Sequence, residues 1–283
     1  MNKIETITFS SEYFDALSTL DCGQIFRFIK LNKGYLVLSK DKGAIIHTEN
    51  GKTTIQCRVN DKEYFINFFD LDRDYKAICD SAKKENLSIL AKAVDCGKGI
   101  RILNQNKEVM LFSFIISKNN NIPRIKGIIE KLCQGLGEKK EFMGIEYFAF
   151  PTIEKMAKTD LTFYKNIGLG YRARYIKNLA EILNNGLNLQ DFNLLSTADL
   201  RKRLLSILGV GKKVADCVLL FGFHKSDSFP VDTWIEKVYK EDFKGTIKDR
   251  IKISEYLVDR FKENSGYYQQ YLFYYKRSHE KKY

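Results

Sequence analysis

The chain has 283 residues, 44% of them hydrophobic, which supports a sizeable folded core and excludes a disordered tail. Two packed domains fit this length better than one. The 47 basic residues outnumber the 35 acidic ones and give a net charge of +12, which favours a polyanionic partner but leaves DNA, RNA and anionic lipid as alternatives.

The N-terminal part is predicted to form a β-rich domain. Residues 1–10 lack the apolar core of a signal peptide, and no apolar run reaches the length of a membrane span. Short β-rich runs then alternate with turn dipeptides such as Lys33-Gly34 and Asn50-Gly51, which predicts an antiparallel meander. The predicted strands are residues 25–29, 35–38, 44–48, 53–59 and 64–69.

Beyond residue 70 the apolar residues follow helical spacing, so the rest of the chain is predicted to be mainly helical. All three prolines, Pro123, Pro151 and Pro230, stand where one helix should end or the next begin. The fold class is therefore α+β, with a β-rich domain over residues 1–100 and a helical domain over residues 101–283. The clearest helical periods are residues 89–94, 109–116, 125–136, 173–183 and 200–208.

The cysteine and histidine content argues against a bound metal. Six cysteines are scattered without a Cys-x-x-Cys pair, and only three histidines accompany them. Neither zinc nor an iron–sulfur cluster has a recognisable set of ligands, so no cofactor is predicted. The cysteines are expected to be thiols in a reducing cytoplasm, and in a bacterium the protein would lie with the nucleoid.

Residues 200–221 are the most informative stretch. They predict an apolar helix with a basic outer face, a tight turn at Gly209 and Gly211, and a second apolar helix. A turn this tight needs permissive backbone angles, and the missing side chains let a phosphate approach the N–H groups at the start of the second helix. The turn is a candidate phosphate clamp, although an ordinary packing corner has the same pattern.

Lys213 and Asp232 form a candidate catalytic pair. Lys213 lies in the first turn of the second helix, where the helix dipole and the neighbouring Lys212 favour a neutral, nucleophilic amine. Asp232 follows Pro230 and is an expected helix N-cap. Facing Lys213, its carboxylate would stabilise an oxocarbenium-like sugar and shuttle the lysine proton. Taken separately, a surface lysine and a structural cap explain the two residues equally well.

Two segments together resemble the signature of helix-hairpin-helix base-excision DNA glycosylases: LGVGKKVADC over residues 208–217 and FPVD over residues 229–232. The lysine at position 213 is similar to that of the bifunctional members, which form a Schiff base with the sugar and cleave the strand by β-elimination. Four more segments resemble 8-oxoguanine DNA glycosylases and extend the resemblance over nearly the whole chain. They are CGQIFR (22–27), SKNNNIPR (117–124), LGYRARY (169–175) and GYYQQYLF (266–273).

The resemblance implies a bifunctional 8-oxoguanine DNA glycosylase and abasic-site lyase, with Lys213 as nucleophile and Asp232 as its carboxylate partner. It implies an N-terminal sheet resembling that of the TATA-binding protein, followed by a helical glycosylase domain. The implied partner is double-stranded DNA containing oxidised guanine. No membrane partner is implied, and a monomer is expected.

The resemblance also implies a pocket for a base extruded from the duplex. The Gly23 carbonyl would accept a hydrogen bond from the N7–H of 8-oxoguanine, which guanine lacks. Cys217, four residues after Lys213 on one helix face, would pack against the base. Gln269 would read the Watson–Crick edge of the base, and Phe273, one turn further along, would stack on its ring.

On the DNA, the resemblance implies that Asn119 fills the gap left by the extruded nucleotide. Arg124 and Arg172 would read the orphaned cytosine, whose acceptor edge suits guanidinium donors, and Tyr171 would wedge the base stack. Taken singly, a polar turn, solvated arginines and a packing ring explain these residues.

Two residues depart from the family pattern: Leu208 stands where proline is common, and Trp234 where histidine is common. The first predicts a slightly looser hairpin, and the second leaves open the phosphate contacts near the extruded nucleotide. Two other functions fit part of the pattern. One is a related lyase-competent glycosylase for a different damaged base. The other is a non-catalytic DNA-binding module, in which Lys213 and Asp232 would have no joint purpose.

Overall fold

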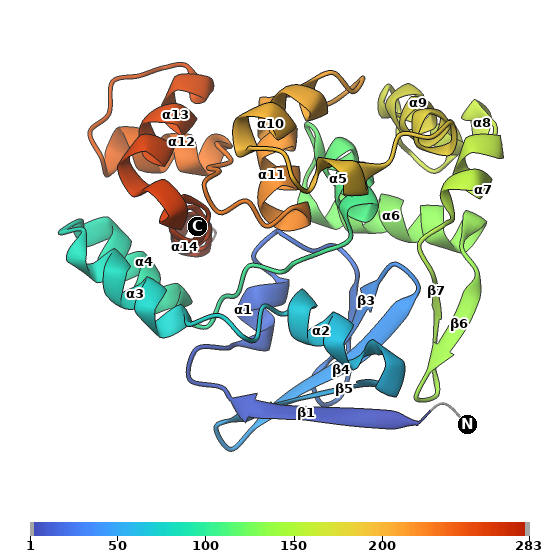
Figure 1. The fold of residues 1–283 in the computed structure, drawn as a ribbon, viewed down its shortest axis with the longest axis horizontal. Helices are drawn as coiled ribbons and strands as arrows, with labels where there is room; N and C mark the ends of the chain where they lie inside the picture. Colours follow the sequence, from blue (N-terminus) through green and yellow to red (C-terminus); the bar gives the residue numbers. More distant parts are fainter. Residues whose placement is uncertain (1–2, 281–283) are drawn as a thin grey trace.

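The computed structural model describes residues 3–280 as a β-sheet body beside a larger helical body (Figure 1). The first body is a five-stranded antiparallel sheet in the order β1-β5-β4-β3-β2. The strands from β2 to β5 follow one another as the predicted meander, and β1 joins its edge beside β5. The strands are β1 (Ile4–Ser10), β2 (Phe28–Lys30), β3 (Tyr35–Ser39), β4 (Lys42–Glu49) and β5 (Lys52–Arg58).

A tight turn sets the register between β4 and β5. The two strands pair as far as Glu49 opposite Lys52. The turn between them places Asn50 and Gly51 at φ values of 51° and 74°. Asn-Gly tolerates this left-handed conformation better than other dipeptides, so the local sequence selects the hairpin.

The sheet differs from its sequence prediction in three places. Residues 64–69 form most of α2 (Lys62–Phe68) instead of a strand, because Tyr64, Phe65 and Phe68 stand at helical spacing and pack their rings together. Of the strand predicted over residues 25–29, only the last two residues join β2. Strand β1 has no predicted counterpart, because it is a half-exposed edge strand without a turn signal before it.

The second body is mainly helical, as predicted, and every predicted helical period overlaps a helix, although residues 206–208 of the last one lie beyond the end of α10. Pro123 lies in the first turn of α6, and Pro151 and Pro230 precede α7 and α12, so all three prolines mark helix starts. A short hairpin of β6 (Lys139–Phe142) and β7 (Ile145–Phe148) interrupts the helices. The remaining helices are α1 (Ala16–Leu20), α3 (Tyr75–Lys84), α4 (Ser88–Gly97), α5 (Lys107–Ser117), α6 (Ile122–Leu136), α7 (Ile153–Lys158), α8 (Leu161–Asn166), α9 (Arg172–Asn184), α10 (Thr197–Leu205), α11 (Lys212–Gly222), α12 (Thr233–Glu241), α13 (Arg250–Phe261) and α14 (Ser265–Glu280).

Each body has its own hydrophobic core, and a small third cluster joins Leu36 and Leu38 to Phe142 and Tyr147. The smaller core, under the sheet, includes Ile46, Ile55 and Phe65, whereas the larger one joins the helices from α3 to α14. Helices α3 and α4 precede residue 100 but belong to the helical core, where α4 packs along α14 (Figure 1). The cores therefore do not divide at residue 100, because these two helices bury their apolar faces on the C-terminal helix.

Two further observations bear on the sequence expectations. Among residues 3–280, no helix has the length and apolar character needed to cross a membrane. All six cysteines are free thiols. The likeness of the sheet to that of the TATA-binding protein stays a prediction.

Candidate active site

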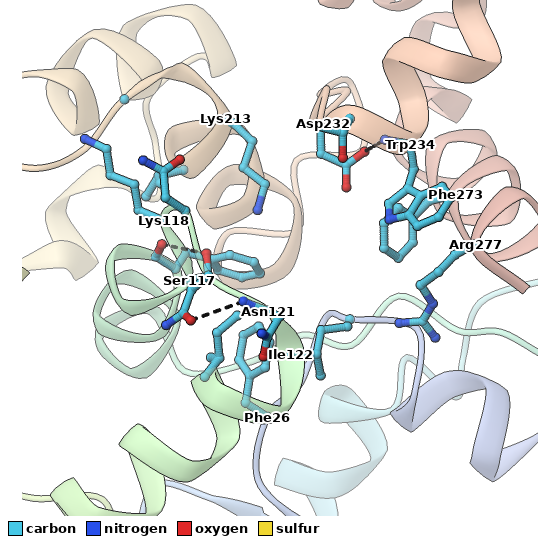
Figure 2. Close-up of a pocket in the computed structure, with 18 of the residues that line it drawn as sticks. Phe26, Ser117, Lys118, Asn121, Ile122, Lys213, Asp232, Trp234, Phe273 and Arg277 are labelled. Carbon is cyan, nitrogen blue, oxygen red and sulfur yellow. Dashed lines mark hydrogen bonds between the residues drawn. The ribbon is translucent and has the colours of Figure 1, made fainter. Parts of the chain in front are cut away.

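A cavity of about 660 Å³ opens between the starts of α11 and α12, the loop after α5, and α14 (Figure 2). Lys213 reaches it from α11, Asp232 and Trp234 from α12, and Phe273 and Arg277 from α14. A volume of this size is typical of a ligand site. The fold thus brings segments that are far apart in the sequence to one space.

Lys213 occupies the first turn of α11, as predicted, and its side chain points into the cavity (Figure 2). Its Nζ lies 5.1 Å from the centre of the Phe114 ring, and this cation–π contact holds the amine beside an apolar side chain. Lys212 also lines the cavity, but its Nζ is bound to Glu255 Oε1 at 3.0 Å.

Asp232 caps α12 and also faces the cavity. Its Oδ1 accepts hydrogen bonds from the backbone N–H of Trp234 at 3.0 Å and of Ile235 at 2.9 Å, which confirms the predicted N-cap. Among the described residues, no hydrogen bond reaches Oδ2. Burial raises the pKa of Asp232, while the N–H donors and the Lys213 amine counteract that rise. One carboxylate oxygen is therefore fixed, and the other is available to a reacting group.

The turn between α10 and α11 forms the predicted helical hairpin. Gly209 has a φ of 90°, and a Cβ there would lie 2.5 Å from Cγ of Tyr175, so both backbone freedom and a missing side chain are required. The prediction of permissive angles is wrong for Gly211, whose φ is −97° as the N-cap of α11. Within residues 3–280, the N–H groups of Gly211, Lys212 and Lys213 donate to no atom, so they are open to an anion.

A narrow inner cavity of about 50 Å³ leads off beside Lys213 and Asp232. Its walls bring together all four residues predicted for the base pocket: Gly23, Cys217, Gln269 and Phe273. This volume holds about one or two water molecules, so a purine enters only if the walls separate. The predicted base pocket is therefore closed in this structure.

The chemistry of these walls suits a planar polar ligand. The buried Oε1 of Gln269 has no hydrogen-bond partner among the described residues, although an unpaired buried acceptor costs about 1–3 kcal/mol. Burial raises the pKa of the Cys217 thiol to about 11, so the sulfur is neutral and serves as a packing surface. Of the residues that line the inner cavity, Gln269 is the one with a buried polar atom that has no hydrogen-bond partner within residues 3–280.

The predicted DNA-contact residues gather at the rim. Asn119, in the loop after α5, is exposed at a φ of 48°, and its Nδ2 lies 3.5 Å from the Tyr171 hydroxyl. Tyr171 is 50% exposed at the start of α9 and packs edge-on against Tyr175. Arg124 is exposed and makes only a long hydrogen bond of 3.4 Å to the Gly168 carbonyl. These three side chains are accessible to a duplex.

Arg172 differs from the expected solvated reader of cytosine. It is only 5% exposed, and it donates hydrogen bonds to the backbone carbonyls of Lys118 and Asn119. In this conformation the guanidinium shapes the loop that carries Asn119 and is not available to a base. A direct contact with cytosine requires Arg172 to leave these carbonyls.

Sequence reasoning did not assign Arg277 and Lys118 to the site, and it left the role of Trp234 open. All three line the large cavity. Arg277 stands one helical turn beyond Phe273, so the spacing that links Gln269 to Phe273 predicts its position as well. The location of Lys118 depends on a loop conformation that has no periodic signal.

Comparison with known proteins identifies relatives for both bodies. Residues 6–109 match the family model of the 8-oxoguanine DNA glycosylase N-terminal domain, and residues 112–263 match that of the HhH-GPD superfamily of base excision DNA repair proteins. The chain is 34% identical over 197 residues to the N-glycosylase/DNA lyase of Saccharomyces cerevisiae. The match covers 64% of this chain, but only 51% of the yeast protein.

Solved structures match over nearly their full length. The Clostridium acetobutylicum 8-oxoguanine glycosylase/lyase, bound to DNA with cytosine opposite 8-oxoguanine, is 34% identical with a TM-score of 0.91. That match covers 99% of this chain and all (100%) of the other. MBOgg1, solved with a low-affinity DNA ligand, is 33% identical with a TM-score of 0.92, and the match covers 98% and 99% of the two chains.

Proposed function

This chain belongs to the 8-oxoguanine DNA glycosylases of the helix-hairpin-helix superfamily, and from that premise we propose that it excises 8-oxoguanine from duplex DNA and then cleaves the strand. The observation that carries the proposal is the convergence of Lys213 and Asp232 on a cavity whose inner end is lined by Gln269, with its amide oxygen unpaired among the described residues. A nucleophile, a carboxylate and a base reader thus share one space.

The duplex would bind across the rim of the cavity. The open N–H groups at the start of α11 take a backbone phosphate, and Tyr171 and Asn119 enter the base stack as the nucleotide leaves it. The extruded base passes through the large cavity and enters between Phe273 and Cys217, which move apart to admit the ring of the base. Gln269 then pairs with its Watson–Crick edge.

The reaction proceeds by substitution at C1′ of the sugar and then by β-elimination of the 3′ phosphate. The Lys213 Nζ lone pair forms a bond to C1′ of the sugar, the glycosidic bond breaks, and the base leaves with the bonding electrons and takes up a proton. Asp232 stabilises the cationic sugar at the transition state and accepts the proton that the amine loses. Ring opening, in which O4′ takes up a proton, gives a Schiff base. Loss of a C2′ proton then forms a C2′–C3′ double bond while the C3′–O bond breaks and the phosphate departs. Water finally hydrolyses the Schiff base and frees the Lys213 amine.

The test uses three duplexes: one with 8-oxoguanine opposite cytosine, one with guanine in its place, and one with an abasic site. We expect base release only from the first and strand cleavage from the first and third. Cleavage of the abasic duplex without release of 8-oxoguanine would indicate a related glycosylase for another damaged base. Binding of all three duplexes without any cleavage would indicate a non-catalytic DNA-binding module.

Substitution of Gly23 by alanine is expected to reduce excision of 8-oxoguanine by about ten- to a hundredfold, because the carbonyl is displaced and its buried hydrogen bond to the base is weakened. Gly23 has a φ of 82°, and a Cβ there would lie 3.3 Å from Cε1 of Phe273. The alanine therefore strains the turn and displaces the ring. The measurement is the single-turnover rate of base release.

Gly51→Ala is the matched control for this experiment. Its φ of 74° gives a similar backbone strain of about 1–2 kcal/mol, but a Cβ at Gly51 meets nothing within 4 Å. The control should lower the melting temperature without changing base release. Equal losses of base release in both variants would contradict a role for Gly23 in the pocket.

We also propose a cytoplasmic location and a monomeric state, as the sequence suggested. One cavity that holds both Lys213 and Asp232, together with one helical hairpin, supplies one set of contacts for one lesion. The net charge of +12 supports binding to DNA phosphates, and affinity should therefore fall as salt concentration rises.

A further inference from the structure

The turn that follows α1 is held by side chains from three directions. A guanidinium nitrogen of Arg277 donates to the backbone carbonyl of Asp21. Gln270 Nε2 donates to the carbonyl of Cys22 at 2.6 Å, and Gln105 Nε2 donates to the carbonyl of Gln24 at 2.8 Å. Arg277, Gln270 and Gln105 are all at most 5% exposed. The carbonyls on either side of Gly23 are therefore occupied by buried donors.

The Gly23 carbonyl is the exception in this turn. Within residues 3–280, no hydrogen bond ends on it. Gly23 itself is only partly buried and lines both cavities, beside Phe273. The turn thus leaves one acceptor open at the base pocket and fixes its neighbours.

We propose that Gln270 and Arg277 are positioning residues that fix the Gly23 carbonyl for recognition of the damaged base. This inference rests on the proposed function. Both residues belong to α14, the helix that also carries Gln269 and Phe273. Helix α14 therefore holds the Gly23 carbonyl, which would accept from the N7–H of the base. It also carries Gln269 for the Watson–Crick edge and Phe273 for the face of the base.

Arg277 connects the two walls of the pocket. Its guanidinium carbon lies 5.5 Å from the centre of the Phe273 ring, and both residues line the large cavity (Figure 2). Besides its bond to the Asp21 carbonyl, the guanidinium lies 3.4 Å from Asp21 Oδ2. The ring that stacks on the base and the turn that presents the carbonyl therefore share one anchor. A shift of the anchor changes the width of the pocket and the direction of the carbonyl together.

The test compares base release from the 8-oxoguanine duplex with strand cleavage of the abasic duplex, which offers no base to the Gly23 carbonyl. Gln270→Met keeps the side-chain length but removes the donor, and Arg277→Met keeps the aliphatic stem but removes the guanidinium. We expect each variant to lower the ratio of the two rates about tenfold, as for a weakened buried hydrogen bond. Arg277→Lys, which retains a cationic donor, should restore most of the ratio.

Tyr274→Phe is the control. It removes the hydrogen bond of 3.2 Å between the Tyr274 hydroxyl of α14 and the Ser18 hydroxyl of α1, and it leaves the bonds to residues 21–24 in place. It should keep the wild-type ratio. If both methionine variants also keep the ratio, or lose both rates in parallel, the inference is overturned while the proposed function stands. A wild-type protein that cleaves abasic DNA but releases no 8-oxoguanine overturns the proposed substrate and this inference with it.

Discussion

Lys213→Gln is expected to abolish the covalent protein–DNA adduct that borohydride traps with the 8-oxoguanine duplex. Glutamine keeps much of the side-chain volume but has no nucleophilic amine, so neither the bond to C1′ nor the Schiff base forms. Base release should fall about a thousandfold or more, as when a nucleophile is removed from a working site. The adduct is measured as a band of reduced mobility in a denaturing gel.

Lys212→Gln is the matched control for this substitution. The two lysines are neighbours in the first turn of α11, but Lys212 Nζ is bound to Glu255. The Lys212 variant should still form the adduct. Loss of the contact between Lys213 and Phe114 costs about 0.5–1 kcal/mol, so the Lys213 variant should remain folded. An adduct of undiminished yield with the Lys213 variant would rule out this lysine as the nucleophile.

Local sequence was sufficient to predict the centre of the site. Lys213, Cys217 and the glycine turn lie within one short stretch, where helical spacing alone places the first two on one face. The N-cap at Asp232 also follows from its neighbours, because proline stiffens the entry to α12. The convergence of the pocket residues was implied by resemblance to a family, because spacing cannot bring Gly23 to α14.

Other features depend on contacts that no local pattern reports. Arg172 looks like a solvated cation in the sequence, and only the fold places two carbonyls against its guanidinium. Residues 64–69 have the composition of a strand, but their aromatic rings gain more burial as a helix over the sheet. Tertiary packing decided both cases, and it also decided which helices joined the larger core.

Asp232→Asn separates the structural role of this residue from its chemical role. Asparagine caps a helix about as well as aspartate, so the bonds to Trp234 and Ile235 should persist and α12 should keep its start. The amide has no negative charge and accepts no proton from Lys213. We therefore expect base release to fall by about a hundred- to ten-thousandfold at unchanged fold, measured as a single-turnover rate beside far-UV circular dichroism.

Asp249→Asn is the control, since Asp249 caps α13 through bonds of 2.6 Å and 3.4 Å to the N–H groups of Ile251 and Lys252. It should leave the rate of base release unchanged. If Asp249→Asn and Asp232→Asn lose the same share of activity, the carboxylate of Asp232 acts only as a cap.

The pH dependence provides an independent test of the same carboxylate. Because burial raises the pKa of Asp232 in the folded protein, the folded chain keeps this proton over a range of pH in which the unfolded chain has already lost it. The contribution of Asp232 to stability is therefore present at low pH and is lost as pH rises through that range. Asparagine does not titrate, so the melting temperature of Asp232→Asn should rise relative to that of the wild type as pH rises.

Activity requires the ionised form of Asp232, so the acid limb of the wild-type rate profile should lie above the ordinary pKa of an aspartate. A limb at or below that value would show that Asp232 is not the group that limits the reaction in acid.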